Sequence, residues 1–136
     1  MGREGGDMSE ITRFATPLGG RAYPPFSMAV RHGGTLYVSG LGPVDGQGNI
    51  ARGDFAAQFD QVIRNLHAIL AEAGTDITRV LKTSVLLVRA TDVPEMNRLY
   101  AAAFDAAHLP ARTTSVVAAL PVPDFLLEIE AIVAVG

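Results

Sequence analysis

The chain has 136 residues, of which 49% are hydrophobic and 18% are charged, and its formal net charge is −3. This apolar content with so little net charge excludes an intrinsically disordered protein and indicates one compact domain. The sequence contains no cysteine, which excludes disulfides, a thiol nucleophile and cysteine-ligated metal sites.

The beginning of the chain, residues 1–15, shows no periodicity and is expected to be a flexible arm before a single domain over residues 16–136. No segment approaches the roughly 18 to 20 apolar residues that a membrane span needs. We therefore expect a cytoplasmic protein with no membrane association. The basic residues are ten arginines and one lysine, Lys82, and they are scattered along the chain, which argues against nucleic acid binding.

The first regular elements are a hairpin and a helix. Residues 26–39 are rich in β-forming residues around Gly33-Gly34, which predicts a hairpin, and the glycine-rich stretch 40–53 predicts a loop. Asp54 is placed to cap a helix that Gly74 ends. The apolar residues of this helix repeat at spacings of three and four: Phe55, Phe59, Val62, Ile63, Leu66, Ile69 and Leu70.

A strand is predicted at Val80–Val88. Leu81, Val85 and Leu87 share one side of this strand, and Leu86 and Val88 share the other. Apolar residues on both sides indicate a strand that is covered on both faces.

The last part of the chain predicts a second helix and two strands. Asp92 and Glu95 are spaced as in a capping box, and Pro110 ends the helical segment. Strands are expected at residues 112–118 and 125–135, which gives the order β-β-α-β-α-β-β and an α+β fold. The buried stripe of this helix is expected to comprise Met96, Leu99, Tyr100, Ala103 and Ala107.

Two helices can cover only one face of a sheet of about five strands. The strands near residues 80–88 and 126–135 are nevertheless apolar on both sides, so a monomer would leave an apolar face in water. We expect an oligomer that buries this face. Loops that cover it are the alternative.

Polar residues interrupt the apolar strands, and Arg112 is the most informative of them. It begins a strand directly after Pro110, where a guanidinium must find an anion or reach water. Its planar fork suits a carboxylate held by two parallel hydrogen bonds. An internal ion pair with Glu128 or Glu130 is the alternative. The full set is Ser39, Arg112, Thr113, Thr114, Glu128 and Glu130.

Other candidate positions also have two interpretations. Glu128 and Glu130 share one strand face and are either edge charges that discourage aggregation or include a partly buried carboxylate that orients a water. Ser39-Gly40 ends a strand, so the backbone can approach a ligand there, or it simply leaves the strand tightly. Asn97 either reaches a pocket or faces solvent.

Metal and nucleotide signals are missing from the sequence. His32, His67 and His108 fall in a turn, a helix and a linker, without metal-ligand spacing. There is no dinucleotide fingerprint, P-loop or nucleophile elbow. We therefore expect neither a metal nor a nucleotide.

Taken jointly, several segments resemble the RidA family, also called YjgF/YER057c/UK114, the reactive intermediate deaminases. The resemblance runs from about residue 25 to residue 135. The matching segments are Pro25–Val30, Leu36–Gly40, Asn65-Leu66, Glu72–Gly74, Val80–Thr83, Asn97 with Tyr100 and Phe104, Pro110–Arg112, and Glu128–Ala131.

The resemblance implies a chorismate-mutase-like α+β fold in which two helices pack on one face of a sheet. It also implies a homotrimer with three ligand sites between neighbouring subunits. The implied activity is the hydrolysis of 2-imino acids, such as 2-iminopropanoate, and of their enamine tautomers to 2-oxo acids and ammonia. No cofactor or metal is used in this reaction.

The resemblance also assigns roles to single residues. Arg112 matches the arginine that grips the substrate carboxylate, and Glu128 matches the glutamate that positions or activates water. The other matching pocket positions are Phe26, Ser39, Gly40, Asn97 and Thr114. This chain departs from the family pattern at three positions. Many members have a tyrosine where this chain has Phe26, a glutamine where it has Leu41 and a cysteine where it has Thr114.

Two other functions stay open at this point. The same pocket fits a non-catalytic protein that binds 2-oxo acids or other small carboxylates, or a chaperone-like protein. RNA cleavage or inhibition of translation is a third function, against which the acidic net charge and the lack of a basic aromatic surface argue.

Overall fold

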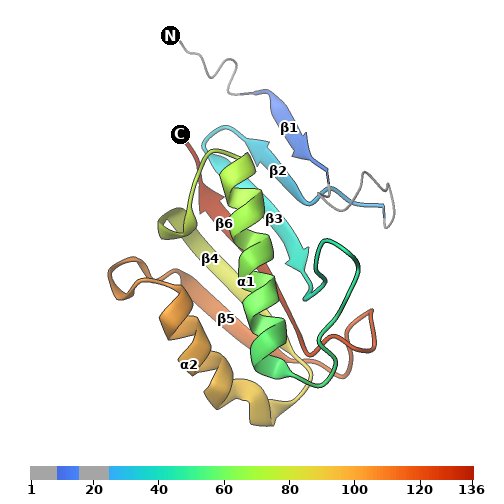
Figure 1. The fold of residues 1–136 in the computed structure, drawn as a ribbon. Helices are drawn as coiled ribbons and strands as arrows, with labels where there is room; N and C mark the ends of the chain where they lie inside the picture. The colour runs from blue at the N-terminus through green and yellow to red at the C-terminus, as the bar shows by residue number, and fades with distance from the viewer. Residues whose placement is uncertain (1–8, 16–24) are drawn as a thin grey trace.

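The structure, a computed structural model, describes residues 9–15 and 25–136 (Figure 1). Their strands form one sheet in the spatial order β1-β2-β3-β6-β4-β5. In chain order the elements are β1 Ile11–Phe14, β2 Ala29–His32, β3 Thr35–Leu41, α1 Phe55–Glu72, η1 Ile77–Arg79, β4 Val80–Leu87, η2 Ala90–Asp92, α2 Val93–Ala103, η3 Ala106–His108, β5 Ala111–Val116 and β6 Leu127–Ala134, where η marks a 3-10 helix.

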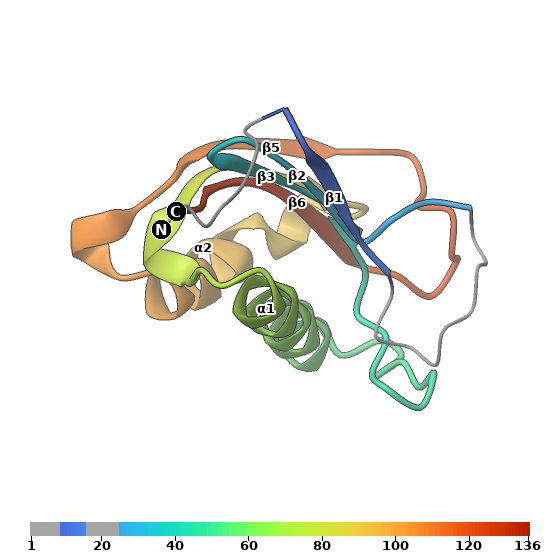
Figure 2. The ribbon, with the colours of Figure 1, turned by 90° about the horizontal axis from the view of Figure 1, so that it is seen from above.

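The sheet is mixed, and both α-helices lie on the same face of it (Figure 2). Neighbouring strands run antiparallel except β4 and β5, which are parallel and are joined through α2. The core fills the space between the sheet and the helices, with Leu36, Leu66, Val85 and Leu127 fully buried. The predicted α+β fold with two helices on one face is confirmed.

The predicted flexible arm is wrong for its last part, because β1 adds a strand to the sheet. Ile11–Phe14 pairs antiparallel with Ala29–His32, and the Met28 amide donates to the Phe14 carbonyl at 2.8 Å. Main-chain hydrogen bonds to the exposed edge of β2 stabilise this short strand, whose side chains are mostly exposed. Residues 1–8 of the predicted arm lie outside the described residues, as do residues 16–24.

The first helix agrees with its prediction at both ends. The Asp54 side chain accepts a hydrogen bond from the Ala57 amide at 3.0 Å, which caps α1. Gly74 has a φ of 77°, the left-handed conformation that ends many helices. The predicted apolar stripe is buried. Neither α1 nor another helix of the described residues combines the length and the apolar character needed to cross a bilayer.

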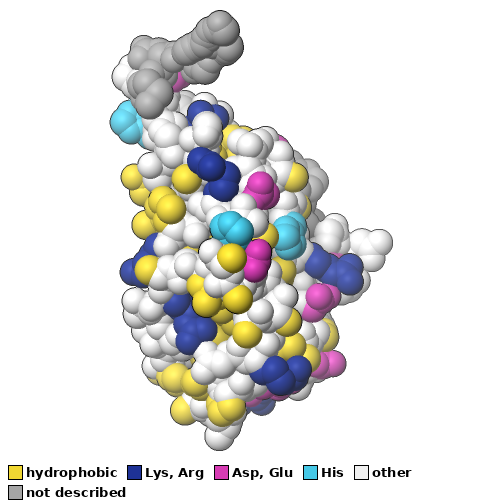
Figure 3. Space-filling view, turned by 90° about the vertical axis from the view of Figure 1, so that its left-hand side faces the viewer, with side chains coloured by type: hydrophobic (Ala, Val, Ile, Leu, Met, Phe, Trp, Pro, Cys, Tyr) yellow, Lys and Arg dark blue, Asp and Glu magenta, His cyan; other side chains and the backbone are white. Residues whose placement is uncertain are grey.

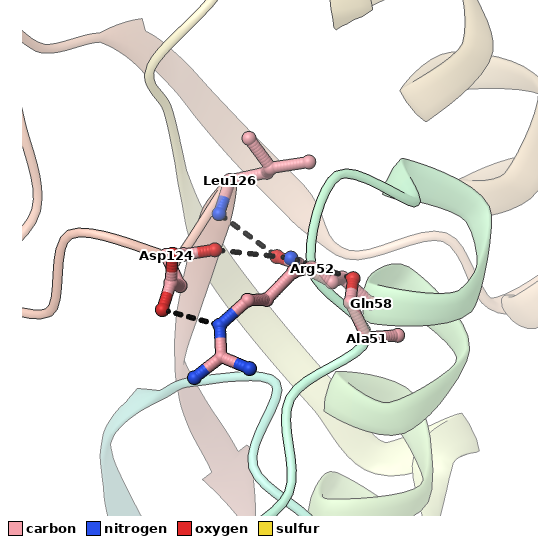
Figure 4. Close-up of polar contacts among 5 residues, drawn as sticks. All are labelled: Ala51, Arg52, Gln58, Asp124 and Leu126. Carbon is pink, nitrogen blue, oxygen red and sulfur yellow. Dashed lines mark hydrogen bonds and ion pairs between the residues drawn. The ribbon is translucent and has the colours of Figure 1, made fainter.

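One polar residue on the buried side of α1, Gln58, joins the helix to two loops (Figure 4). Its amide nitrogen donates to the carbonyls of Ala51 and Asp124, both at 3.0 Å, and its oxygen accepts from the Leu126 amide at 2.8 Å. The side chain is 0% exposed. Gln58 therefore fixes the loop before α1 against the segment that leads into β6.

The predicted capping box of the second helix is wrong. Asp92 makes no capping hydrogen bond, because its carboxylate accepts from Arg89 Nε at 2.8 Å and from Arg89 Nη2 at 3.2 Å. The helix also ends at Ala103 rather than near Ala107, which is exposed. The Asp105 carboxylate accepts from the Ala107 amide and starts η3 instead.

The side assigned to Leu81 is also wrong. The register between β4 and β6 shifts between Val80 and Lys82, and this bulge changes the alternation of the strand. Leu81 is consequently 53% exposed, whereas the polar Thr83 is fully buried on the helix side together with Val85.

The face of the sheet opposite the helices remains uncovered, as expected. Tyr37 on β3 and Ile132 on β6 are direct neighbours in the register, and they are 52% and 37% exposed. Lys82, Ser84 and Glu130 join them around a shallow hollow of about 210 Å³. None of the loops within residues 9–15 and 25–136 covers these side chains, and oligomerisation stays a prediction.

Replacing Gln58 with leucine should lower the free energy of unfolding by about 3 kcal/mol, because it leaves two carbonyls and one amide buried without partners. Urea denaturation at fixed protein concentration measures the loss. Gln61→Leu is the matched control, since Gln61 bonds only the Asn65 side chain on the same helix. Equal losses in the two variants would contradict this role of Gln58.

Candidate functional site

Arg112 lies at the edge of the sheet, and helix α2 holds its side chain. In the register of β5 with β4 it is the partner of the buried Thr83, so its side chain is on the helix side of the sheet. Nη2 donates to Asn97 Oδ1 at 2.7 Å, and Nη1 lies 3.7 Å from Met96 Sδ. The guanidinium carbon is 4.8 Å from the centre of the Tyr100 ring. Three residues of one helix therefore fix this cation.

The guanidinium has no acidic partner in the described part of the chain. None of the ion pairs within residues 9–15 and 25–136 includes Arg112, so the alternative of an internal pair with Glu128 or Glu130 is wrong. Arg112 is exposed. A guanidinium has more N–H donors than the two that contact α2, and the remaining ones are available to an anion.

Glu128 lies on the opposite face of the sheet. It pairs with Leu86 of β4, and its side chain lies on the uncovered face together with Glu130. Burial raises the pKa of the Glu128 carboxyl above its usual value, and the negative charge of Glu130 raises it further. This carboxyl therefore keeps its proton to a higher pH than an ordinary glutamate.

The absence of a side chain at Gly40 leaves space for the Glu128 carboxylate. A Cβ atom at Gly40 would lie 2.7 Å from Glu128 Oε1, closer than such atoms come. The register of β3 with β6 shifts between Val38 and Leu41, which brings the backbone of Gly40 under this carboxylate. The structure thus adds a second reason for glycine here, beyond the predicted approach of a ligand to the backbone.

Ser39 precedes Gly40 in the chain and is bonded to the segment that carries Phe26. Ser39 Oγ donates to the Ser27 carbonyl at 2.6 Å, and the Ser39 amide donates to the Met28 carbonyl at 2.9 Å. The hydroxyl of Ser39 therefore fixes the segment that carries Phe26, whose ring is 55% exposed. Gly40, which lies against the Glu128 carboxylate, directly follows Ser39 in the chain.

Asn97 and Thr114 belong with Arg112. Asn97 is exposed on α2 and accepts the hydrogen bond from Arg112, while its interpretation as a pocket residue stays a prediction. Thr114 pairs with the buried Val85 and shares the strand side of Arg112. Leu41, where many family members have glutamine, is 2% exposed in the core and offers no polar atom.

The predicted residues therefore form two groups on opposite sides of the sheet. Arg112, Asn97 and Thr114 lie on the helix side at the β5 edge, and the glutamate group lies on the uncovered face. One chain does not bring Arg112 and Glu128 together. Among the described residues, no three His, Cys, Asp or Glu side chains are arranged to hold a metal ion. The glutamate group consists of Ser39, Gly40 and Glu128, and the place of Phe26 beside them stays a prediction.

Sequence reasoning placed Met96 and Tyr100 in the buried stripe of the second helix but did not connect them with Arg112. Their positions on the helix, together with Asn97, put them on neighbouring turns of one helix side. That Arg112 would lie against this side depends on the pairing of β5 with β4, for which the sequence contains no local signal.

Comparisons with known proteins agree with this architecture. The family model described as endoribonuclease L-PSP matches residues 20–135. A 2-iminobutanoate/2-iminopropanoate deaminase of Rattus norvegicus is 39% identical over 132 residues, which cover 95% of both chains. A RutC family protein of Pyrococcus horikoshii is 40% identical over 109 residues, covering 79% of this chain and 85% of its own length.

Solved structures share the fold at similar identity. A protein of the conserved Rid family from Yersinia pestis is 33% identical with a TM-score of 0.85, and the match covers 93% of this chain and 100% of that one. The YjgF gene product of E. coli is 34% identical with a TM-score of 0.80, covering 90% and 98% of the two chains. Because the family model matches residues 20–135 and a solved Rid protein shares both sequence and fold, the chain belongs to the RidA (YjgF/YER057c/UK114) family.

Proposed function

We propose that this protein hydrolyses 2-imino acids and their enamine tautomers to 2-oxo acids and ammonia. The observation that carries the proposal is the exposed guanidinium of Arg112, which helix α2 holds in place and which forms no ion pair with the residues that the structure describes. The rat relative is named for this reaction with 2-iminobutanoate and 2-iminopropanoate. No metal or cofactor is part of the proposal.

Arg112 binds the substrate carboxylate. Its planar fork can donate two parallel hydrogen bonds to the two oxygens, and its charge neutralises the acid. The contacts with Asn97 and Met96 use only two N–H donors, so donors remain for this grip. Binding at the carboxylate fixes the C=N carbon at one place relative to the protein.

Glu128 handles the proton of the attacking water. The imine reacts in its protonated form. As a carboxylate, Glu128 takes a proton from water while the water oxygen bonds to the C=N carbon and the C=N electron pair moves to the nitrogen, which gives a neutral carbinolamine. Glu128 then returns this proton to the nitrogen, the C–N bond breaks with loss of ammonia, and the carbinolamine hydroxyl gives its proton back to the Glu128 carboxylate, which leaves a 2-oxo acid. The released ammonia finally takes this proton from Glu128 and leaves as ammonium. An enamine first takes a proton on carbon to become the imine. The raised pKa of Glu128 suits this group to both steps.

The site is completed by a second copy of the chain. Arg112 and Glu128 lie on opposite faces of one sheet, so they can meet only across a subunit boundary. The uncovered apolar face around Tyr37 and Ile132 supplies a surface that self-association would bury. A homotrimer with sites between neighbours accounts for both observations.

Replacing Arg112 with alanine should lower kcat/KM for 2-iminopropanoate about 100-fold, because it removes charge-assisted hydrogen bonds of about 3 kcal/mol. The imine is generated by an amino acid oxidase, and its disappearance is followed in time. Arg98→Ala is the matched control, since Arg98 is an exposed arginine of α2 that pairs with Glu95. Turnover that survives the loss of Arg112 would refute the proposal.

The same assay separates the other functions. Binding of a 2-oxo acid without any turnover in the native protein would identify a carboxylate-binding protein. RNA cleavage that persists in Arg112→Ala and falls steeply with salt would favour the activity in the family model's description. Figure 3 shows basic side chains spread among acidic and apolar ones on one side of the described chain, which does not favour RNA.

Mixing two inactive variants tests the shared site. In Arg112→Ala and Glu128→Gln proteins every site lacks one of the two groups. When both chains are co-expressed in equal amounts, about a quarter of all sites should regain turnover, because in each hybrid trimer one subunit gives Arg112 to a neighbour that gives Glu128. Mixtures that stay as inactive as the separate variants would contradict a site between subunits.

The pKa of Glu128 predicts the acid limb of the pH profile. Turnover should fall as pH drops through the pKa of Glu128, which burial and the negative charge of Glu130 raise. Glu130→Gln removes the neighbouring negative charge, so it should lower this pKa and move the limb to lower pH. The measurement is kcat/KM against pH for both proteins. An acid limb that Glu130→Gln leaves in place would contradict the coupling of the two carboxyls.

The raised pKa of Glu128 should affect the stability of the fold in the opposite direction to turnover, because it favours the folded state at low pH. A folded-state pKa above the unfolded value favours the folded state at low pH, and this advantage is lost as pH rises through the folded pKa. Glu128→Gln should therefore stabilise the protein at neutral pH relative to the native chain, with the difference shrinking in acid.

A further inference from the structure

Tyr100 lies directly beneath the guanidinium of Arg112. The guanidinium carbon is 4.8 Å from the ring centre, at which distance a cation is attracted to the face of an aromatic ring. Tyr100 itself is 5% exposed, so its ring is part of the core while one face meets the exposed cation. The proposed reaction steps do not yet assign a role to Tyr100.

The ring is held from two further sides. The Tyr100 hydroxyl and the Thr83 hydroxyl are 2.7 Å apart, and Thr83 is fully buried. The Phe104 ring stacks on Tyr100 with centroids 4.3 Å apart and planes 25° apart. Thr83 is also the register partner of Arg112 in the sheet. Through Thr83 on β4, Tyr100 is therefore fixed relative to the neighbouring strand β5, which carries Arg112.

We propose that Tyr100 is a positioning residue that sets the plane of the Arg112 guanidinium for a carboxylate. This inference rests on the proposed function of Arg112. The ring covers one face of the guanidinium, so an acid meets the N–H edge of the group. Asn97 supplies the second constraint, because its bond to Nη2 fixes the orientation of that edge.

The physical benefit is ordering before binding. A long exposed arginine samples several rotamers, and a ligand that needs one of them bears the entropy cost of selecting it. Contacts with the ring and with Asn97 restrict the side chain in advance. Loss of the ring should therefore weaken carboxylate binding and leave the chemical step, in which Arg112 does not exchange a proton, nearly unchanged.

The experiment measures the Kd of 2-oxobutanoate by calorimetry, with kcat and KM for 2-iminobutanoate, in the full-length protein. Tyr100→Met keeps a long apolar side chain but has no ring, and it should raise both Kd and KM about tenfold while kcat stays within about twofold. Tyr100→Phe keeps the ring and should bind nearly as the native protein, although Thr83 loses its partner. Tyr100→Leu replaces the methionine variant should that one not fold.

A double-mutant cycle shows whether Tyr100 acts through Arg112. In an Arg112→Ala background, Tyr100→Met should have no further effect on the Kd. Phe59→Leu on α1 is the stability control, since it removes a buried ring of the same core far along the chain from Arg112. It should lower the unfolding temperature without changing the Kd.

The outcomes separate the two proposals. Unchanged Kd and KM in Tyr100→Met, with binding lost in Arg112→Ala, would overturn the positioning role and leave the proposed function standing. Equal weakening by Phe59→Leu would also overturn it, because the effect would then follow stability alone. Unchanged binding in Arg112→Ala would overturn the proposed function and this inference with it.

Discussion

Arg112 remains available to an anion because, within the described part of the chain, the groups that hold it are neutral. An amide oxygen of Asn97, the sulfur of Met96 and the ring face of Tyr100 contact the guanidinium. These contacts fix its position without cancelling its charge, as a carboxylate partner would. The rest of the proposed site depends on this constraint, since a mobile or neutralised arginine would bind a small acid weakly.

The fold creates this constraint through one connection. β4 and β5 are parallel, so the chain between them must cross over, and α2 is the crossover helix. Its packing against the helix side of the sheet brings Tyr100 onto Thr83 and the edge of α2 onto Arg112. The same pairing leaves β5 at the edge of the sheet, where Arg112 reaches solvent.

The uncovered face carries the other half of the proposed chemistry. Glu128 lies over Gly40 in a partly buried position, beside Glu130, and both surroundings favour its protonated form. The apolar surface around Tyr37 lies on the same face. Under the proposed assembly, one contact between subunits buries this surface and brings a carboxyl to a neighbouring arginine, so assembly and catalysis depend on the same interface.

The sequence by itself determined the features that depend on neighbours along the chain. The cap at Asp54, the stop at Gly74 and the hairpin turn at Gly33-Gly34 follow from residue types at fixed spacings, as does the shared face of Glu128 and Glu130. The family resemblance added the candidate residues of the site. Each of these inferences needs only a helical or strand period.

Tertiary structure alone decided what depends on distant partners. Ile11–Phe14 is a strand because the edge of β2 is open, and the bulge in β4 exposes Leu81 and buries Thr83. Asp92 binds Arg89 rather than its own helix end. The separation of Arg112 from Glu128 by the sheet likewise follows from strand pairing, because register between segments far apart in the chain sets which face each side chain occupies.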